Sequence, residues 1–258
     1  MFGLERRLVY FPDRTHLRTP ASIGLEFEDV WITTSDKELL HAWWVPGTGR
    51  NAMILFHGNA GNISFRLGEA ALLRGRLQAS MLLFDYRGYG LSTGHPSEAG
   101  TRLDAEAAAR WLVAERQIST ERLIYFGRSL GAAVATHLAS EVRPAALILE
   151  SPLPSVARLT RLSYPWLAPV IAPLMVTRYD TLGVLKAVKC PVFVAHGDDD
   201  EVIPFELGRE VFEAAGEPKV WYPVAGGGHN DMAVVGGTTY LEAIEAFVTE
   251  HVGGSMAA

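Results

Sequence analysis

The sequence has one cysteine, Cys190, and no excess of basic residues. A single cysteine excludes an intrachain disulfide and argues against a zinc site with cysteine ligands. The formal net charge of −6 argues against nucleic acid or an anionic membrane surface as a partner, because both attract basic faces. The chain also lacks a glycine-rich phosphate-binding motif and any closely spaced set of metal ligands, so we expect neither a cofactor nor a metal.

Long apolar runs are absent as well. No uninterrupted run approaches the roughly 18 residues that a membrane-spanning helix needs. The first twelve residues contain Glu5, Arg6 and Arg7, which interrupt a short apolar stretch and make it unlike a cleavable signal peptide. We therefore expect a cytoplasmic protein without stable insertion into a membrane, although an anchor upstream of this sequence stays open.

The chain has 258 residues, 48% of them hydrophobic, which is enough to bury one large core in a single domain over 1–258. Short apolar runs rich in β-branched and aromatic residues alternate with helical patterns, which is typical of a mostly parallel sheet covered by helices on both faces. A short polar turn separates the first two runs, which predicts an antiparallel pair. The runs are 30–32, 41–45, 52–56, 80–84, 123–126, 146–149, 192–195 and 220–222.

Two segments have clear helical patterns. Residues 97–114 begin with a capping serine followed by helix formers, and residues 238–251 carry apolar side chains at helical spacing. Residues 152–189 depart from the alternation, because they contain five prolines among large apolar side chains. Prolines interrupt long helices, so this region is predicted to form short helical pieces rather than another strand.

The most informative stretch is Gly127-Arg128-Ser129-Leu130-Gly131, which lies between a predicted strand and the start of a helical pattern. A G-x-S-x-G sequence at such a junction is typical of a nucleophile elbow, since only glycine fits on either side of the sharply turned serine. The stretch predicts Ser129 as a nucleophile. A glycine-rich turn with a helix-capping serine is the alternative.

A serine hydroxyl attacks poorly until a base removes its proton, so the elbow predicts a histidine and a carboxylate elsewhere in the chain. Residues 196–204 follow the predicted strand 192–195 and include three adjacent aspartates at 198–200. Glycine-rich residues 226–231 follow the last predicted strand and include His229. Spacing does not choose among the three aspartates, and Glu150 is a further candidate for the acid.

The segment His57-Gly58-Asn59-Ala60-Gly61-Asn62 follows another predicted strand. A tetrahedral oxyanion needs two N–H donors, one from the residue after the nucleophile and one from a loop of this kind. We therefore assign the backbone amides of Leu130 and Asn59 to this role. A simple turn with Asn62 as a helix N-cap is the alternative.

Together, the segments 57–62, 85–92, 127–131, 196–204 and 228–231 resemble those of serine hydrolases of the α/β-hydrolase superfamily. Within it, the chain is similar to the small-lid branch that contains bacterial carboxylesterases and eukaryotic depalmitoylating thioesterases. The resemblance covers nearly the whole chain. It implies the α/β-hydrolase fold, with a mostly parallel eight-stranded sheet, flanking helices and a small helical lid.

The resemblance also implies roles for individual residues. The acid of this family lies in an H-G-x-x-D pattern, which selects Asp200. Asp85 and Arg87 fall in the family's D-x-R-G-x-G-x-S turn and are expected to brace it. His57 and His196 are expected to pack loops, because the mechanism needs only one base.

The lid is predicted at about 155–188, between the predicted strands 146–149 and 192–195. Trp166, Leu167, Ile171 and Met175 concentrate apolar surface there and are predicted to line the pocket for the acyl chain. The alternative is that these side chains cover the edge of the sheet, as apolar clusters commonly do.

The sequence thus predicts a serine esterase in which Ser129 attacks the acyl carbon, His229 transfers the proton and Asp200 orients the imidazole. Its expected partner is a small acyl ester. Hydrolysis of acyl-protein or acyl-CoA-type thioesters is the close alternative, because the same residues would serve. A catalytically silent hydrolase-fold binding protein is the alternative from another class. No motif indicates the oligomeric state.

Overall fold

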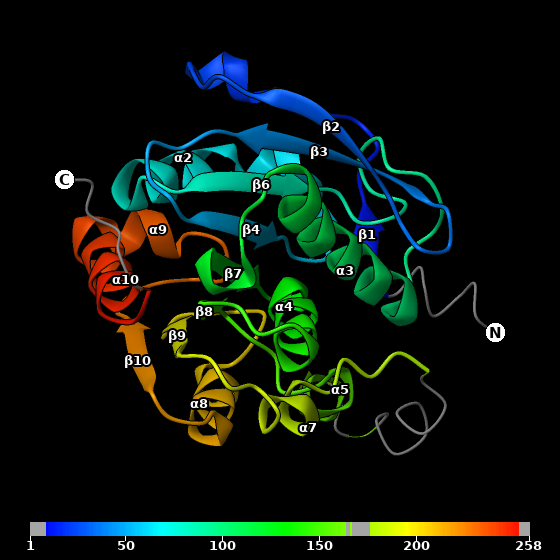
Figure 1. The fold of residues 1–258 in the computed structure, drawn as a ribbon. Helices are drawn as coiled ribbons and strands as arrows, with labels where there is room; N and C mark the ends of the chain where they lie inside the picture. Colours follow the sequence, from blue (N-terminus) through cyan, green and yellow to red (C-terminus); the bar gives the residue numbers. More distant parts are fainter. Residues whose placement is uncertain (1–8, 164–165, 167–175, 253–258) are drawn as a thin grey trace.

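A computed structural model describes residues 9–163, 166 and 176–252, and its central feature is an eight-stranded sheet of order β10-β9-β8-β7-β4-β6-β3-β2 (Figure 1). Strand β3 is antiparallel to both of its neighbours, and the remaining strands point the same way. Each of the eight predicted runs forms one strand, which confirms the predicted sheet. The strands are β2 (Glu28–Thr33), β3 (Leu39–Val45), β4 (Ala52–Phe56), β6 (Ser80–Phe84), β7 (Leu123–Arg128), β8 (Ala146–Glu150), β9 (Val192–Gly197) and β10 (Lys219–Val224).

Helices cover both faces of the sheet (Figure 1). One face packs against α3 (Glu98–Glu115), α4 (Leu130–Glu141), α7 (Thr181–Leu185) and α8 (Phe205–Ala214). The other face packs against α2 (Leu67–Leu77), α9 (Met232–Val235) and α10 (Gly237–His251). Central strands β4 and β7 are buried along their whole length, as strands between two helical layers must be.

The two predicted helices are confirmed as α3 and α10. The Oγ of Ser97 accepts a hydrogen bond from the amide of Gly100 at 3.0 Å, as its predicted capping role requires. Helix α2 was not predicted, because Gly68 and Gly75 interrupt its sequence and lower its helix propensity. Its burial against the sheet overrides this weak local preference.

The region between β8 and β9 contains α5 (Val156–Ser163) and α7 among the described residues, in agreement with the predicted short helical pieces. Trp166 is 79% exposed. Leu167, Ile171 and Met175 lie outside the described residues, so the lid stays a prediction. Among the helices of the described ranges, none is long and apolar enough to cross a membrane.

Ser129 occupies the sharp turn between β7 and α4, with φ 54° and ψ −118°. Such a positive φ is strained for any residue with a side chain. The turn also brings α4 against the end of β4: a Cβ at Gly131 would lie 2.0 Å from the carbonyl oxygen of Phe56. A Cβ at Gly127 would lie 2.5 Å from the carbonyl oxygen of Gly131. The two flanking glycines are therefore required by close packing, as expected for an elbow.

Gly131→Ala is expected to lower the free energy of unfolding by about 1–3 kcal/mol, the usual cost of forcing a methyl group into filled space. Gly75→Ala is the control, because no atom of the described residues lies within 4 Å of a Cβ placed there. That control is expected to raise the free energy of unfolding by about 0.5–1 kcal/mol. Urea unfolding of the three proteins measures both changes, and equal effects of the two substitutions would contradict the packing argument.

Candidate active site

Three side chains meet at the edge of the sheet where β7, β9 and β10 end. The Oγ of Ser129 lies 3.1 Å from Nε2 of His229. The Nδ1 of His229 lies 2.8 Å from one carboxylate oxygen of Asp200 and 3.1 Å from the other. A proton on Nδ1 that is donated to Asp200 leaves Nε2 free to accept from the serine hydroxyl. The three residues thus form one continuous hydrogen-bonded series.

The structure separates the three adjacent aspartates. Asp200 is the one whose carboxylate contacts His229. The side chain of Asp198 instead accepts a hydrogen bond from the amide of Gly226 at 2.6 Å and so ties the two loops together. Asp199 is exposed, and its amide donates to the carbonyl of Gly227. Geometry therefore agrees with the choice of Asp200 that the resemblance implied.

Asp200 is held in an ionised state by its surroundings. Burial raises its pKa, but hydrogen bonds with His196 and His229 outweigh burial and hold the pKa well below its usual value. The amide of Ile203 donates to the same carboxylate at 2.8 Å, and the hydroxyl of Ser151 donates at 2.8 Å. A carboxylate that stays charged at neutral pH can stabilise a positive charge on the neighbouring imidazole.

Glu150, the rival candidate for the acid, belongs to a separate buried network beneath the elbow. One of its oxygens accepts from Nε of Arg128 at 2.5 Å, and the other accepts from the hydroxyl of Tyr240 at 2.5 Å. Arg128 also donates to the carboxyl group of Glu69 on α2. Both oxygens of Glu150 are therefore bound to partners other than His229.

Glu69 is the unusual member of this network. Burial raises the pKa of Glu69 to about 8, against the opposing effect of the Arg128 charge. Its folded-state pKa therefore lies above its unfolded value of 4.5. Between these two values the folded protein holds a proton that the unfolded chain releases, so this contribution to stability is complete below the lower value. It is lost as the pH rises toward 8.

Glu69→Gln, which cannot ionise, is expected to reduce the loss of stability between about pH 6 and pH 8. One proton changes the free energy of unfolding by at most about 1.4 kcal/mol per pH unit. The slopes of the variant and the unmodified protein should therefore differ by no more than this amount. Urea unfolding at several pH values measures the slope. Glu206→Gln, at an exposed position of α8, is the control and should leave the slope unchanged. An unchanged slope in Glu69→Gln would disprove the assignment.

Two backbone amides lie beside Ser129. Leu130 is the first residue of α4, where an amide has no acceptor within its own helix. Asn59 lies in the loop after β4, and a Cβ on its neighbour Gly58 would lie 3.6 Å from the Cβ of Ser129. Within the described part of the chain, neither the Leu130 nor the Asn59 amide donates a hydrogen bond. Both amides can therefore donate to a bound group.

The loop that carries Asn59 is fixed by hydrogen bonds from distant parts of the chain. The side-chain amide of Asn59 donates to the carbonyl of Val9 at 2.7 Å. The backbone carbonyl of Asn59 accepts hydrogen bonds from the hydroxyl of Tyr89 at 2.8 Å and from the amide of Phe11 at 3.0 Å. The side chain of Asn62 accepts from the amide of Ser64 at 2.9 Å, which is the N-cap role considered for it above.

His57 and His196 have the contacts of packing residues. His57 is fully buried, and burial lowers its pKa to about 4, so the ring is neutral at neutral pH. Its Nδ1 donates to the carbonyl of Gly58 at 2.7 Å, and its ring lies against Tyr86. The Nε2 of His196 lies 2.8 Å from the carbonyl of Ile203. Neither ring lies within hydrogen-bond distance of Ser129 in the structure.

The braced turn after β6 is also confirmed as a structural element. The guanidinium of Arg87 donates to Asp104 on α3 at 2.8 Å and to Asp36 at 2.7 Å. Burial raises the pKa of Asp104 to about 6, although Arg87 opposes this shift. These contacts join the turn to α3 and to the β2–β3 connection, and they lie outside the Ser129 site.

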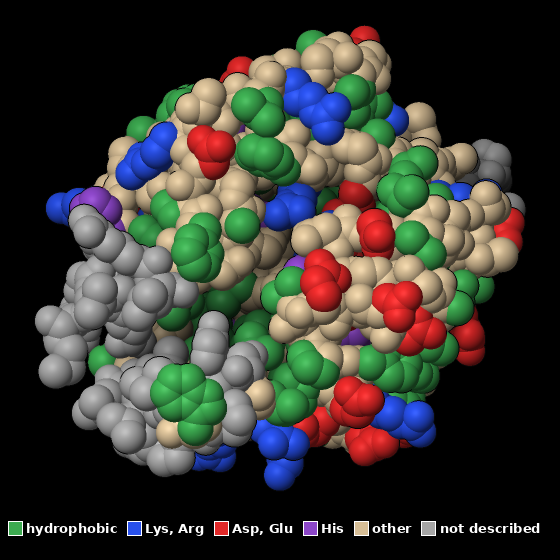
Figure 2. Space-filling view, turned by 180° about the vertical axis from the view of Figure 1, so that it is seen from behind, with side chains coloured by type: hydrophobic (Ala, Val, Ile, Leu, Met, Phe, Trp, Pro, Cys, Tyr) green, Lys and Arg blue, Asp and Glu red, His purple; other side chains and the backbone are tan. Residues whose placement is uncertain are grey.

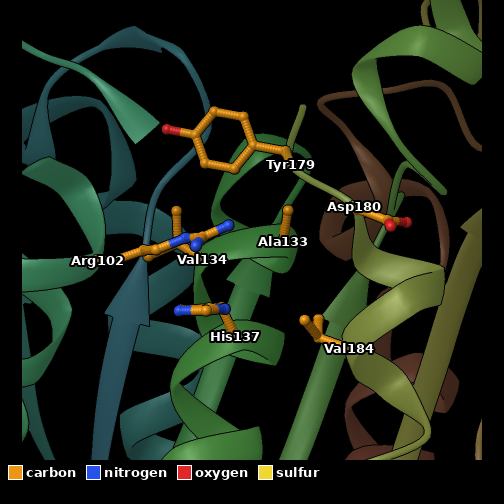
Figure 3. Close-up of a pocket in the computed structure, with 7 residues that line it drawn as sticks. All are labelled: Arg102, Ala133, Val134, His137, Tyr179, Asp180 and Val184. Atoms are coloured by element: carbon orange, nitrogen blue, oxygen red, sulfur yellow. The ribbon is translucent and has the colours of Figure 1, made fainter. Parts of the chain in front are cut away.

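A small cavity lies between α3, α4 and α7, with Tyr179 at one end and His137 at the other (Figure 3). Its volume of about 10 Å³ suits a single water molecule and is too small for an acyl substrate. None of Ser129, Asp200 and His229 lines it. Its lining residues are Arg102, Ala133, Val134, His137, Tyr179, Asp180 and Val184.

Acidic side chains gather on one half of the face shown in Figure 2. In the loops that carry Asp200 and His229, two exposed acidic side chains accept hydrogen bonds from backbone amides. Glu201 accepts from the amide of His229 at 3.3 Å, and Asp231 accepts from the amide of Gly228 at 2.7 Å. Acidic residues near His229 thus help to hold the loop that presents its ring.

Comparison with known proteins agrees with this arrangement. A family model described as the alpha/beta hydrolase fold matches residues 51–172. An uncharacterized protein of Mycobacterium tuberculosis is 41% identical over 97% of this chain and 89% of its own length. The α/β-hydrolase domain-containing protein WAV2 of Arabidopsis thaliana is 30% identical over 97% of this chain and 90% of its own length. The chain therefore belongs to the α/β-hydrolase family.

A solved structure shows the same fold at lower sequence similarity. An esterase of Pyrococcus furiosus superposes with a TM-score of 0.79 at 22% identity, covering 95% of this chain and 98% of the esterase. The fold predicted from the resemblance is confirmed by both kinds of comparison.

Proposed function

We propose that the protein is a serine hydrolase that cleaves carboxylic esters through an acyl-enzyme intermediate. The observation that carries this proposal is the continuous series from Asp200 through His229 to Ser129, in which each contact is within 3.1 Å. The free amides of Asn59 and Leu130 beside the serine add the second requirement of acyl transfer, which is a site for an oxyanion. The esterase among the structural relatives is consistent with this reaction class.

In the proposed reaction, Nε2 of His229 takes the hydroxyl proton as Oγ of Ser129 attacks the acyl carbon. The charge that forms on the imidazole is stabilised by the ionised Asp200, and the charge on the tetrahedral oxygen is stabilised by the two amides. His229 then protonates the leaving alcohol. A water molecule then attacks the acyl carbon of the acyl-enzyme while His229 takes its proton. His229 returns the proton to Oγ of Ser129 as the carboxylic acid product leaves.

Ser129→Ala and His229→Ala are each expected to abolish ester hydrolysis, with losses in kcat of order 10⁶, because the residues act as a unit. The measurement is hydrolysis of a short-chain p-nitrophenyl ester, together with a thermal melt of each variant. A fluorophosphonate probe should label the unmodified protein and leave Ser129→Ala unlabelled. Ser140→Ala, on α4, is the control and should retain both activity and labelling. An unmodified protein that neither labels nor hydrolyses esters would favour the silent binding protein.

Asp200→Asn is expected to lower kcat by about 10⁴, the loss that follows when the acid of such a series is neutralised. Glu150→Gln tests the rival assignment. It should reduce kcat far less and act mainly on stability, since Glu150 binds Arg128 and Tyr240. Both variants are assayed as folded protein below their melting temperatures. A larger kcat loss in Glu150→Gln would transfer the role of acid to Glu150.

Rates of hydrolysis can distinguish the substrate classes that this proposal allows. Comparing kcat/KM for esters and thioesters of graded acyl length distinguishes an esterase from an acyl-protein or acyl-CoA-type thioesterase. The proposed lid at 155–188 would set the preferred acyl length, and the exposed side chain of Trp166 offers apolar surface for such a contact.

A further inference from the structure

Three potential metal ligands lie together away from the Ser129 site. His16 comes from the segment before β2, His41 from β3, and Asp85 from the position directly after β6. One ligand atom from each residue lies within 4.8 Å of the other two. His41 and Asp85 are buried, and the side chain of His16 is 10% exposed. Only folding brings these residues together, because they are far apart in the sequence.

The antiparallel pairing of β3 with β6 brings two of them side by side. Ala42 pairs with Phe84, and the amide of Asp85 donates to the carbonyl of His41 at 2.9 Å. The segment that carries His16 crosses the same place. Its Nε2 lies 2.7 Å from Oδ2 of Asp85, and the rings of His16 and His41 have centroids 5.0 Å apart.

The hydrogen bonds of His41 leave one of its ring nitrogens without a partner. Asp29 accepts from Nε2 of His41 at 2.9 Å and from the indole nitrogen of Trp43 at 3.0 Å. This arrangement fixes the proton on Nε2, so Nδ1 carries a lone pair. The Nδ1 atom is buried and has no hydrogen-bond partner among the residues that the structure describes. A carboxylate that accepts from the far nitrogen of a histidine is the usual support of a metal-binding imidazole.

The backbone of Gly90 packs closely against two of the ligand atoms. A Cβ at this position would lie 1.9 Å from Oδ2 of Asp85 and 2.4 Å from Nε2 of His16. Its φ of +46° is a conformation that glycine adopts without strain. A side chain at position 90 would therefore displace both ligand atoms, so the turn after β6 requires glycine where its backbone packs against them.

We propose that His16, His41 and Asp85 bind a Zn²⁺ ion, with water as the fourth ligand. Two imidazoles and one carboxylate are a ligand set that suits zinc. A neutral imidazole binds zinc through Nε2 with its proton on Nδ1, so zinc would take the place of the hydrogen bond between Nε2 of His16 and Oδ2 of Asp85. The sequence predicted no metal, because no ligand pair stands at a recognisable spacing.

The role of this ion is structural. It ties the segment around His16 to β3 and to the turn after β6. The other oxygen of Asp85 accepts from the amide of Ile63 at 2.9 Å, directly after the loop that carries Asn59. The hydrogen bonds of Ser129 and His229 involve none of the three ligands. Zinc therefore stabilises the fold without entering the reaction.

The test uses the untagged full-length protein after treatment with a chelator. Titration with ZnCl₂ in a calorimeter is expected to show one tightly bound ion per chain. At zinc concentrations about 100 times the dissociation constant, Tm is expected to rise by roughly 5–10 °C. Co²⁺ in place of zinc should give the visible absorption of a four-coordinate site.

Substitutions of single residues test which side chains bind the ion. His16→Ala and His41→Ala should each abolish the Tm shift, and Asp29→Asn should weaken binding about 10–100-fold. If His41→Ala does not fold, His16→Ala gives the result, since that side chain lies at the surface of the cluster. His137→Ala, which removes a partly exposed imidazole near Glu141, and His229→Ala should both retain binding. The proposal is overturned if the unmodified protein binds no zinc, or if His16→Ala binds it as tightly.

Discussion

The close approach of α4 to the carboxyl end of β4 is the contact on which the candidate site depends. A side chain at Gly131 would overlap the carbonyl of Phe56, and only glycine permits this distance. The same contact forces Ser129 into a strained backbone conformation, with φ of 54°. Strain of this kind persists only where the surrounding structure enforces it. Here it raises the serine side chain above the sheet and places the Leu130 amide beside it.

Asp200 and His229 lie in the loops that follow the neighbouring strands β9 and β10, and these loops support each other. Asp198 binds the amide of Gly226, while the amide of Asp199 donates to the carbonyl of Gly227. These bonds set the separation between Asp200 and His229 by backbone geometry rather than by the flexible side chains alone. Preorganisation of this kind is what proton transfer between positioned groups requires.

A buried ionic network lies directly beneath Ser129. Arg128, the residue before Ser129, contacts two carboxyl groups, of which Glu69 has its pKa raised by burial to about 8. Burial of Glu69 outweighs the opposing charges of Arg128 and Arg66, so this carboxyl group is best accommodated with a proton. The network joins the elbow to α2, β8 and α10, and therefore couples the position of Ser129 to packing on one whole face of the sheet.

The sequence by itself predicted the strands, the sharp turn at Ser129 and the choice of Ser129 and His229 as candidate catalytic residues. Apolar runs indicate strands that are buried on both faces, and the two glycines around a serine indicate a tightly packed turn. Both patterns can be recognised within a few consecutive residues. The tertiary structure decided which aspartate reaches His229, that Glu150 pairs with Arg128, and that His16, His41 and Asp85 meet. These outcomes depend on side chains from distant segments approaching within hydrogen-bond distance, or within 4.8 Å for the ligand atoms of His16, His41 and Asp85, which neither spacing nor composition encodes.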